Sequence, residues 1–65
     1  PSPLSPRERE ILDCAGQGLT TQQTADHLGI GVKTVETHRA HILQKLGAAN
    51  ITEAVQTMAR PARPG

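Results

Sequence analysis

The segment "TTQQTADHLGIGVKTVETHRAHILQKLG", residues 20–47, says most about the fold, because it joins a short helical pattern to a longer one through the link "GIG". A connection this short that opens on glycine forces two helices to cross steeply, which predicts a helix-turn-helix. Gly29 supplies a positive φ. Ala25 is small enough for close helix contact, and Ile30 and Val35 fill the wedge between the two helices. A generic helical hairpin uses similar residues and stays open as an alternative.

Capping patterns divide the chain into four predicted helices. Each pattern is a short polar residue followed three positions later by Glu or Gln. The three pairs are Ser5 with Glu8, Thr20 with Gln23, and Asn50 with Glu53. The remaining helix is predicted over residues 32–46 and ends at Gly47. No strand pattern and no internal repeat is visible, so the predicted fold class is all-α, a compact bundle with short connections.

The predicted domain covers residues 5–60, with the helix-turn-helix at about 21–40. Residues 1–4 are assigned to a linker end. Residues 61–65 are assigned to a flexible tail, because the proline-rich "RPARPG" cannot continue a helix. At 65 residues the chain is one domain or a piece of a longer protein.

Composition excludes several functional classes. The chain has no aromatic residue, which argues against modules that stack single-stranded bases. Its one cysteine, Cys14, excludes an internal disulfide and is expected to be a small buried hydrophobe. No apolar run is long enough for a bilayer, so no membrane contact is expected. His38 and His41 lie three residues apart but lack further ligands, so no metal site is expected. No clustered carboxylates, nucleophile–base pair or phosphate-cradling glycine loop is visible, so no enzymatic activity and no cofactor is expected.

The helix over residues 32–46 has two distinct faces. At about 100° per residue, Val35, Ile42 and Leu46 form the apolar stripe. The opposite face is narrow and free of bulky side chains, which suits a helix lowered into the major groove of DNA. A plain solvated face is the alternative. The candidate base-reading residues are Glu36, Thr37, Ala40, His41 and Gln44.

Four blocks carry a resemblance: "LSPRERE", "GLTTQQTADHLGI", "KTVETHRAHILQKLG" and "NITEAV". In order and without gaps, they resemble the C-terminal DNA-binding domain of LuxR/FixJ/NarL-type bacterial transcription regulators. The resemblance implies a four-helix domain whose helix from Val32 recognises double-stranded DNA. It also implies a last helix that pairs two copies on DNA, an N-terminal sensory or phosphoacceptor domain, and a cytoplasmic, nucleoid-associated protein.

The resemblance further implies particular residue roles. Lys33, Thr34 and Lys45 would contact phosphates, as would Thr20 and Thr21 at the start of the preceding helix. His38, beside the apolar stripe, is expected to be half-buried or to contact phosphate. The dimer surface would lie on the last helix and include Ala54, Val55 and Met58. Family members often have lysine where Glu36 stands and a capping residue where Gly31 stands.

Three interpretations of Glu36 stay open. It can form an ion pair within its helix, with Lys33 or Arg39. It can accept a hydrogen bond from a cytosine amino group. It can also weaken binding to most DNA by its charge, leaving affinity dependent on dimerisation.

Two other functions compete with DNA-binding transcription regulation. A sigma-factor promoter-binding region also has a capped helix before a helix-turn-helix, although "NITEAV" argues against it. A helical protein-interaction module that never touches DNA is compatible with the formal net charge of only +1.

Overall fold

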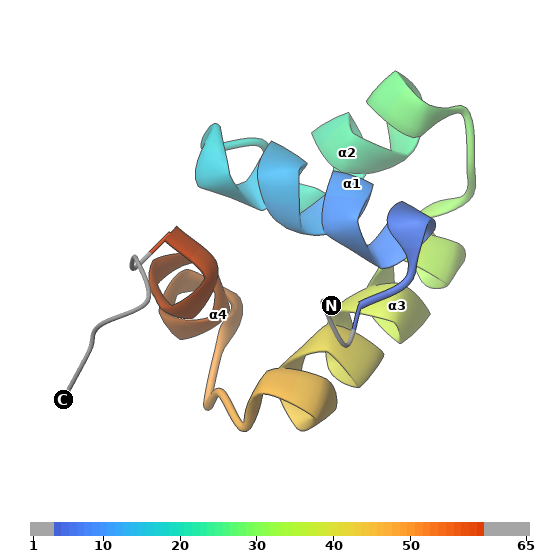
Figure 1. The fold of residues 1–65 in the computed structure, drawn as a ribbon. Coiled ribbons are helices and arrows are strands. Elements are labelled where there is room, and N and C mark those ends of the chain that lie inside the picture. Colours follow the sequence, from blue (N-terminus) through green and yellow to red (C-terminus); the bar gives the residue numbers. More distant parts are fainter. Residues whose placement is uncertain (1–3, 60–65) are drawn as a thin grey trace, which may run out of the picture.

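The structure, a computed structural model, describes residues 4–59, all of whose regular structure is helical. The elements are α1 (Pro6–Gly16), α2 (Thr21–Leu28), α3 (Val32–Leu46) and α4 (Ile51–Ala59) (Figure 1). The predicted bounds of the third helix are confirmed at both ends. Residues 1–3 and 60–65, which include most of the predicted linker and all of the predicted tail, lie outside the described residues.

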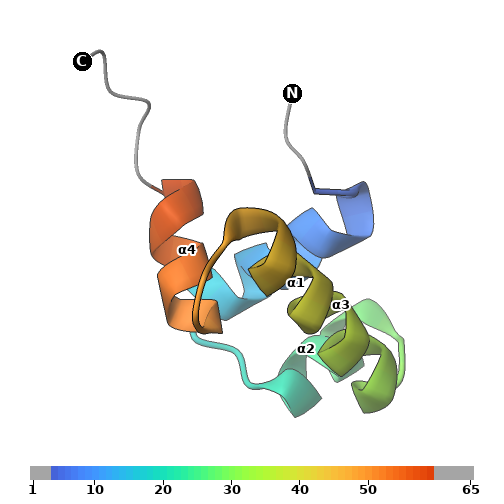
Figure 2. The ribbon, with the colours of Figure 1, turned by 90° about the horizontal axis from the view of Figure 1, so that it is seen from below.

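Helices α1 and α3 form the centre of the arrangement, because each packs against all three of the other helices. Helices α2 and α4 both contact α1 and α3. They lie on opposite sides of that pair, and α2 does not touch α4 within residues 4–59 (Figures 1 and 2). One side of α3 is therefore held by its neighbours, and the remainder faces outward.

The predicted capping boxes of α1 and α2 are confirmed. The Ser5 hydroxyl accepts the Glu8 backbone N–H at 3.2 Å, and the Glu8 carboxylate accepts the Ser5 N–H at 2.9 Å. Thr20 and Gln23 exchange the same pair of bonds at 3.1 and 2.9 Å. Each box satisfies backbone donors that the first turn of a helix leaves without partners.

The start of α4 differs in one detail from the predicted box. Asn50 Oδ1 accepts the Glu53 N–H at 2.8 Å, as expected. The Glu53 carboxylate, however, accepts from the backbone N–H of Ala49 at 3.2 Å. The long Glu side chain thus reaches one residue further back and caps the turn before the helix.

The turn between α2 and α3 depends on a left-handed glycine. Gly29 has φ 69° and donates its backbone N–H to the Ala25 carbonyl, which ends α2. Gly31 is the N-cap residue directly before α3 and forms no side-chain cap, because glycine has no side chain. The positive φ predicted for Gly29 is confirmed, and the two helices cross directly after it.

The core contains no aromatic side chain and is closed by aliphatic residues from every helix. Val35, Ile42 and Ala54 are fully buried, at 0% exposure. Leu4, which the sequence assigned to the linker, is also buried and packs in this core, so the ordered domain begins earlier than the predicted Ser5. The core residues are Leu4, Ile11, Leu12, Ala25, Val35, Ile42 and Ala54.

Candidate nucleic-acid interface

The two faces predicted for α3 are confirmed. Val35 and Ile42 are fully buried, and Leu46 packs against the core from the same side. The opposite face is exposed along its whole length. Its exposed residues are Lys33, Thr34, Glu36, Thr37, Ala40, His41, Gln44 and Lys45. All five candidate base-reading residues are therefore accessible to a partner, with no large apolar side chain among them.

The Thr37 hydroxyl, on the exposed face of α3, forms a hydrogen bond within the helix. It donates to the Lys33 carbonyl at 3.1 Å, one turn earlier. The hydroxyl hydrogen is thereby used within the helix, so the oxygen lone pairs and the methyl group remain for a partner. Thr37 can accept a hydrogen bond or contact a thymine methyl group.

The start of α2 is tied to α3 by a contact that the sequence did not reveal. The Thr21 hydroxyl oxygen accepts a hydrogen bond from Arg39 Nη1 at 2.8 Å, and both residues are half-buried. Thr20 is exposed, and its hydroxyl oxygen already accepts the Gln23 N–H as a cap. Of the two threonines predicted to contact phosphate, Thr21 is therefore held by a side chain of α3, and Thr20 by the backbone of its own helix.

Glu36 is exposed and forms no ion pair within residues 4–59. The two ion pairs of this region are Arg7–Glu10 and Glu8–Lys45. Arg39, one of the two intrahelical partners considered for Glu36, donates to Thr21 instead. The ion-pair interpretation of Glu36 therefore gains no support, and its carboxylate lies unpaired on the exposed face of α3.

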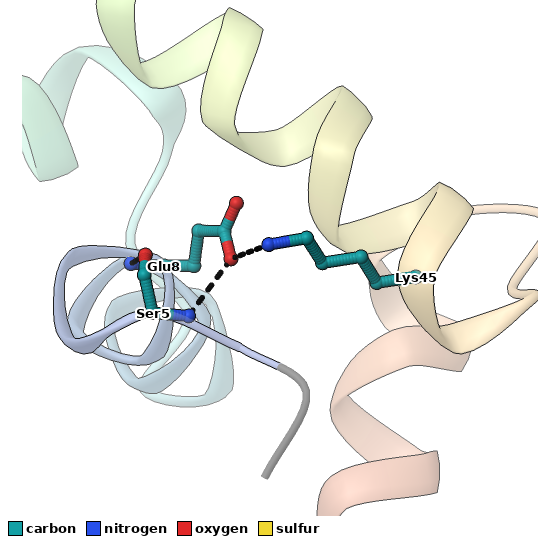
Figure 3. A network of polar contacts seen from close by, with 3 residues as sticks. All are labelled: Ser5, Glu8 and Lys45. Atoms are coloured by element: carbon teal, nitrogen blue, oxygen red, sulfur yellow. Dashed lines mark hydrogen bonds and ion pairs between the residues drawn. The ribbon is translucent and has the colours of Figure 1, made fainter.

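Lys45 has a partner inside the fold. Its ammonium donates to Glu8 Oε1 at 2.8 Å, and the same carboxylate oxygen accepts from the Ser5 backbone N–H (Figure 3). The Glu8 side chain is 4% exposed, whereas that of Lys45 is 41% exposed. The hydrogen bond from Lys45, helped by that from Ser5, lowers the pKa of Glu8 below its usual value of 4.5, against the opposing effect of burial.

The predicted half-burial of His38 is confirmed, and one of its ring nitrogens is unusual. Nδ1 is buried and has no hydrogen-bond partner. A buried N–H without an acceptor is rarer in folded proteins than a buried acceptor without a donor. In the neutral ring we therefore place the hydrogen on Nε2, which makes Nε2 the hydrogen-bond donor of this ring.

The three residues predicted for a dimer surface on α4 differ in exposure. Ala54 is fully buried within the chain, so its side chain is core and cannot meet a second copy. Val55 and Met58 are half-buried against the core. Both line a hollow of about 250 Å³ between α1 and α4. Its lining residues are Arg9, Leu12, Asp13, Gly16, Val55 and Met58.

Arg39 was considered from the sequence only as one of two possible ion-pair partners of Glu36, and its contact with Thr21 was not predicted. Four residues after Val35 and three before Ile42, it borders the buried stripe of α3. That spacing was the available signal, because an arginine beside a buried stripe can lay its apolar stem along the neighbouring packed surface. The hydrogen-bonding partner on α2 was not readable from spacing.

In residues 4–59, no three His, Cys, Asp or Glu side chains gather as a metal ion would require. None of the helices α1–α4 is both long enough and apolar enough to span a membrane.

Comparisons with known proteins agree with this architecture. The chain is 41% identical over 56 residues to the transcriptional regulatory protein UhpA of Salmonella typhimurium, covering 86% of the chain. It is 43% identical over 53 residues to the transcriptional regulatory protein FixJ of Azorhizobium caulinodans, covering 82% of the chain. The chain spans only 29% and 25% of the lengths of these two relatives.

Solved structures show the same fold. The transcription factor GerE superposes with a TM-score of 0.83 at 33% identity, over 89% of this chain and 87% of that one. The response regulator ChrA of a heme-sensing two-component system gives 0.82 at 46% identity, over 88% of this chain and 28% of that one. The family model of bacterial regulatory proteins, luxR family, matches residues 2–58. The four-helix domain with its helix-turn-helix belongs to the luxR family of bacterial regulatory proteins.

Proposed function

We propose that this chain binds double-stranded DNA in a sequence-specific manner as the output domain of a bacterial transcription regulator. The observation that carries the proposal is the exposed face of α3, from Lys33 to Gln44, which holds small and polar side chains only. A helix of this kind fits the major groove, about 12 Å wide, where base edges differ in their hydrogen-bonding groups. Its buried face fixes α3 on α1 and α2, so the reading face is presented rigidly.

Contacts to the DNA backbone would set the position of α3. Phosphate contacts fix register and orientation, whereas base-edge contacts carry sequence information. We assign the backbone role to Thr20, Thr21, Lys33, Thr34, His38 and Lys45. Lys45 differs from Lys33, because its ammonium is already 2.8 Å from the Glu8 carboxylate. Its share of the phosphate attraction is therefore smaller than that of an unpaired lysine.

Base readout is assigned to the exposed turns of α3. Gln44 offers both a donor and an acceptor, Thr37 an acceptor and a methyl group, and Ala40 a methyl group. Glu36 accepts hydrogen bonds only, and cytosine N4 is the donor in the major groove that suits a carboxylate. His41 completes the set. Because Glu36 has no ion pair in residues 4–59, its carboxylate needs no internal contact to be broken first.

The longer protein would use this domain in a dimer under control of a second domain. Relatives named as transcriptional or response regulators are much longer than the matched region, since this chain spans 29% of UhpA and 28% of ChrA. This difference in length supports a further domain in the longer protein, and we place a regulatory domain before this one. The domain proper corresponds to residues 5–60 extended back to Leu4. Such a regulator would act in the cytoplasm, on the bacterial chromosome.

Pairing of two copies would involve Val55 and Met58 on α4, but not the side chain of Ala54. Val55 and Met58 border the hollow between α1 and α4 and remain half-exposed in a single copy. A second helix packed there would remove this apolar surface from water. Two copies related by a twofold axis would then meet two half-sites of an operator.

The deciding experiment is a titration of the domain into labelled random-sequence duplex at several salt concentrations, read by fluorescence anisotropy. We expect log affinity to fall linearly with log salt, at about 0.9 per phosphate neutralised. Operator selection from the same pool should then enrich a site with two related halves. Binding that is absent at the lowest salt would reject the DNA function and favour a protein-interaction module.

A charge placed on α4 tests the pairing surface separately. Met58→Glu should leave the affinity for a single half-site within about twofold and weaken binding to the full site about tenfold or more. Gln56 is exposed on the same helix, so Gln56→Glu adds the same charge outside the hollow and serves as the matched control. Equal losses on the full site in the two variants would reject the pairing surface.

A further inference from the structure

The Arg39–Thr21 contact joins two helices at the point where the proposed interface begins. Arg39 Nη1 donates to Thr21 Oγ1 at 2.8 Å, across 18 positions of the chain. Thr21 is the first residue of α2, and Arg39 lies in the turn of α3 between the exposed Glu36 and Ala40. Both side chains are half-buried, so the contact is placed by packing while part of each remains accessible.

Apart from one lone pair on the Thr21 hydroxyl oxygen, the unused hydrogen-bonding groups of this pair are donors. A threonine hydroxyl has one O–H donor, and an arginine has five N–H donors and no acceptor. Arg39 uses Nη1 on Thr21, and within residues 4–59 no acceptor serves the rest of its guanidinium. The Thr21 hydroxyl accepts from Arg39, and its own hydrogen has no acceptor in the same region. The pair therefore presents a positive charge and several free donors.

We propose that Arg39 and Thr21 form one phosphate-binding pair, in which Arg39 contacts a DNA phosphate and also orients the Thr21 hydroxyl hydrogen toward it. The guanidinium group matches phosphate geometry and bonds to it with charge-assisted strength. Because the Thr21 oxygen accepts from Arg39, its hydrogen points away from the guanidinium, toward the anion. This inference rests on the proposed DNA-binding function and assigns Arg39 a role in it.

A purely structural link between α2 and α3 makes different predictions. Such a link affects stability only, whereas a phosphate contact changes the number of counterions released on binding. The salt dependence of affinity therefore separates the two roles. If the loss of affinity in the double variant differs from the sum of the two single losses, the two residues act as one unit.

The experiment measures duplex affinity over a series of salt concentrations for wild type, Arg39→Gln, Thr21→Val and the double variant, using a selected operator site. Arg39→Gln should lower affinity about tenfold and reduce the salt slope by about one phosphate contact. Thr21→Val should lower affinity about threefold or more in the wild type. In the Arg39→Gln background, the same threonine change should cost less than about twofold.

Matched controls lie elsewhere in the fold. Arg7→Gln removes the same charge from α1, where Arg7 pairs with Glu10 at 3.4 Å. Thr57→Val removes a hydroxyl of α4 that donates to the Glu53 carbonyl. Neither should change the slope as Arg39→Gln does. Arg39→Lys keeps the positive charge, so it should keep most of the wild-type slope of log affinity against log salt concentration. Thermal unfolding by circular dichroism shows that each variant is folded.

An unchanged slope in a folded Arg39→Gln variant would overturn the proposal and leave Arg39 a structural link. An equal slope change in Arg7→Gln would overturn it too, since net charge alone would then suffice. Additive losses in the double variant would reject the pairing with Thr21. If Arg39→Gln does not fold, Thr21→Val in the Arg39→Lys background gives the coupling. Wild-type protein that binds no duplex would instead reject the DNA-binding function itself.

Discussion

Lys45, in the last turn of α3, reaches across to Glu8 in the first turn of α1 and places its ammonium 2.8 Å from the Glu8 carboxylate (Figure 3). The same oxygen of Glu8 accepts the Ser5 backbone N–H of the capping box. One carboxylate therefore caps α1 and fastens it to the end of the proposed recognition helix. A residue that sequence similarity implied for phosphate contact also maintains the fold.

Lys45→Met should destabilise the domain by about 1–2 kcal/mol, because a nearly buried carboxylate loses its charged hydrogen-bond partner. The value is moderate since the lysine side chain is 41% exposed to solvent. Denaturant unfolding followed by circular dichroism gives the change in free energy. Lys33→Met on the exposed face of α3 is the matched control and should change stability by less than about 0.5 kcal/mol. Equal losses in the two variants would show that the Glu8 contact contributes nothing.

Ionisation of Glu8 should contribute to the pH dependence of the free energy of unfolding. Its pKa is lower in the folded chain than the ordinary value of 4.5, so the folded state binds the proton less readily than the unfolded state. The resulting stabilisation is present above the ordinary value of 4.5 and is lost as pH falls through the folded-state pKa. Glu8→Gln should lack this component, so its stability should decline less steeply over that acidic range. Parallel curves for the two proteins would exclude Glu8 as the source.

Replacing Gly16 or Gly18 by alanine should change the stability of the domain in opposite directions. Gly16 lies in α1 with helical backbone geometry, and an added Cβ would meet Val55 Cγ1 at 3.5 Å, an ordinary contact. Gly16→Ala should therefore stabilise the domain by about 0.4–1 kcal/mol. Gly18 has φ 86°, and Gly18→Ala should destabilise it by about 1–2 kcal/mol although the space around it is open. Melting temperatures of both variants test the pair, and a loss on Gly16→Ala would contradict the packing of α1 on α4.

Glu36 should determine preference at one base pair. On a selected operator, Glu36→Gln should weaken binding while leaving affinity for a scrambled duplex within about twofold, because a neutral amide accepts a weaker hydrogen bond from cytosine N4. Glu36→Lys should raise affinity for the scrambled duplex and increase the salt slope by about one. Anisotropy titrations on both duplexes give the comparison. Equal shifts on the two duplexes in both variants would eliminate base readout and leave a general electrostatic effect.

The helices and their ends follow from local features of the sequence. The capping signals at Ser5, Thr20 and Asn50 act over three or four residues, and so does the apolar periodicity that places Val35 and Ile42 in the core. The turn glycine after α2 behaved as expected, because a positive φ is a local property of the backbone. Interactions this short depend little on how distant segments pack, and for this reason the predicted bounds of α3 matched the structure.

The pairing of long polar side chains, in contrast, follows from tertiary packing alone. Arg39 and Thr21 are 18 positions apart, and Lys45 and Glu8 are 37 apart. Such contacts depend on the crossing of α3 with α2 and α1, which no spacing in the sequence states. Packing also buries Leu4, which the sequence had assigned to a linker, and Ala54, which it had assigned to a dimer surface. A long polar side chain has several partners within reach, and the three-dimensional position of each helix selects among them.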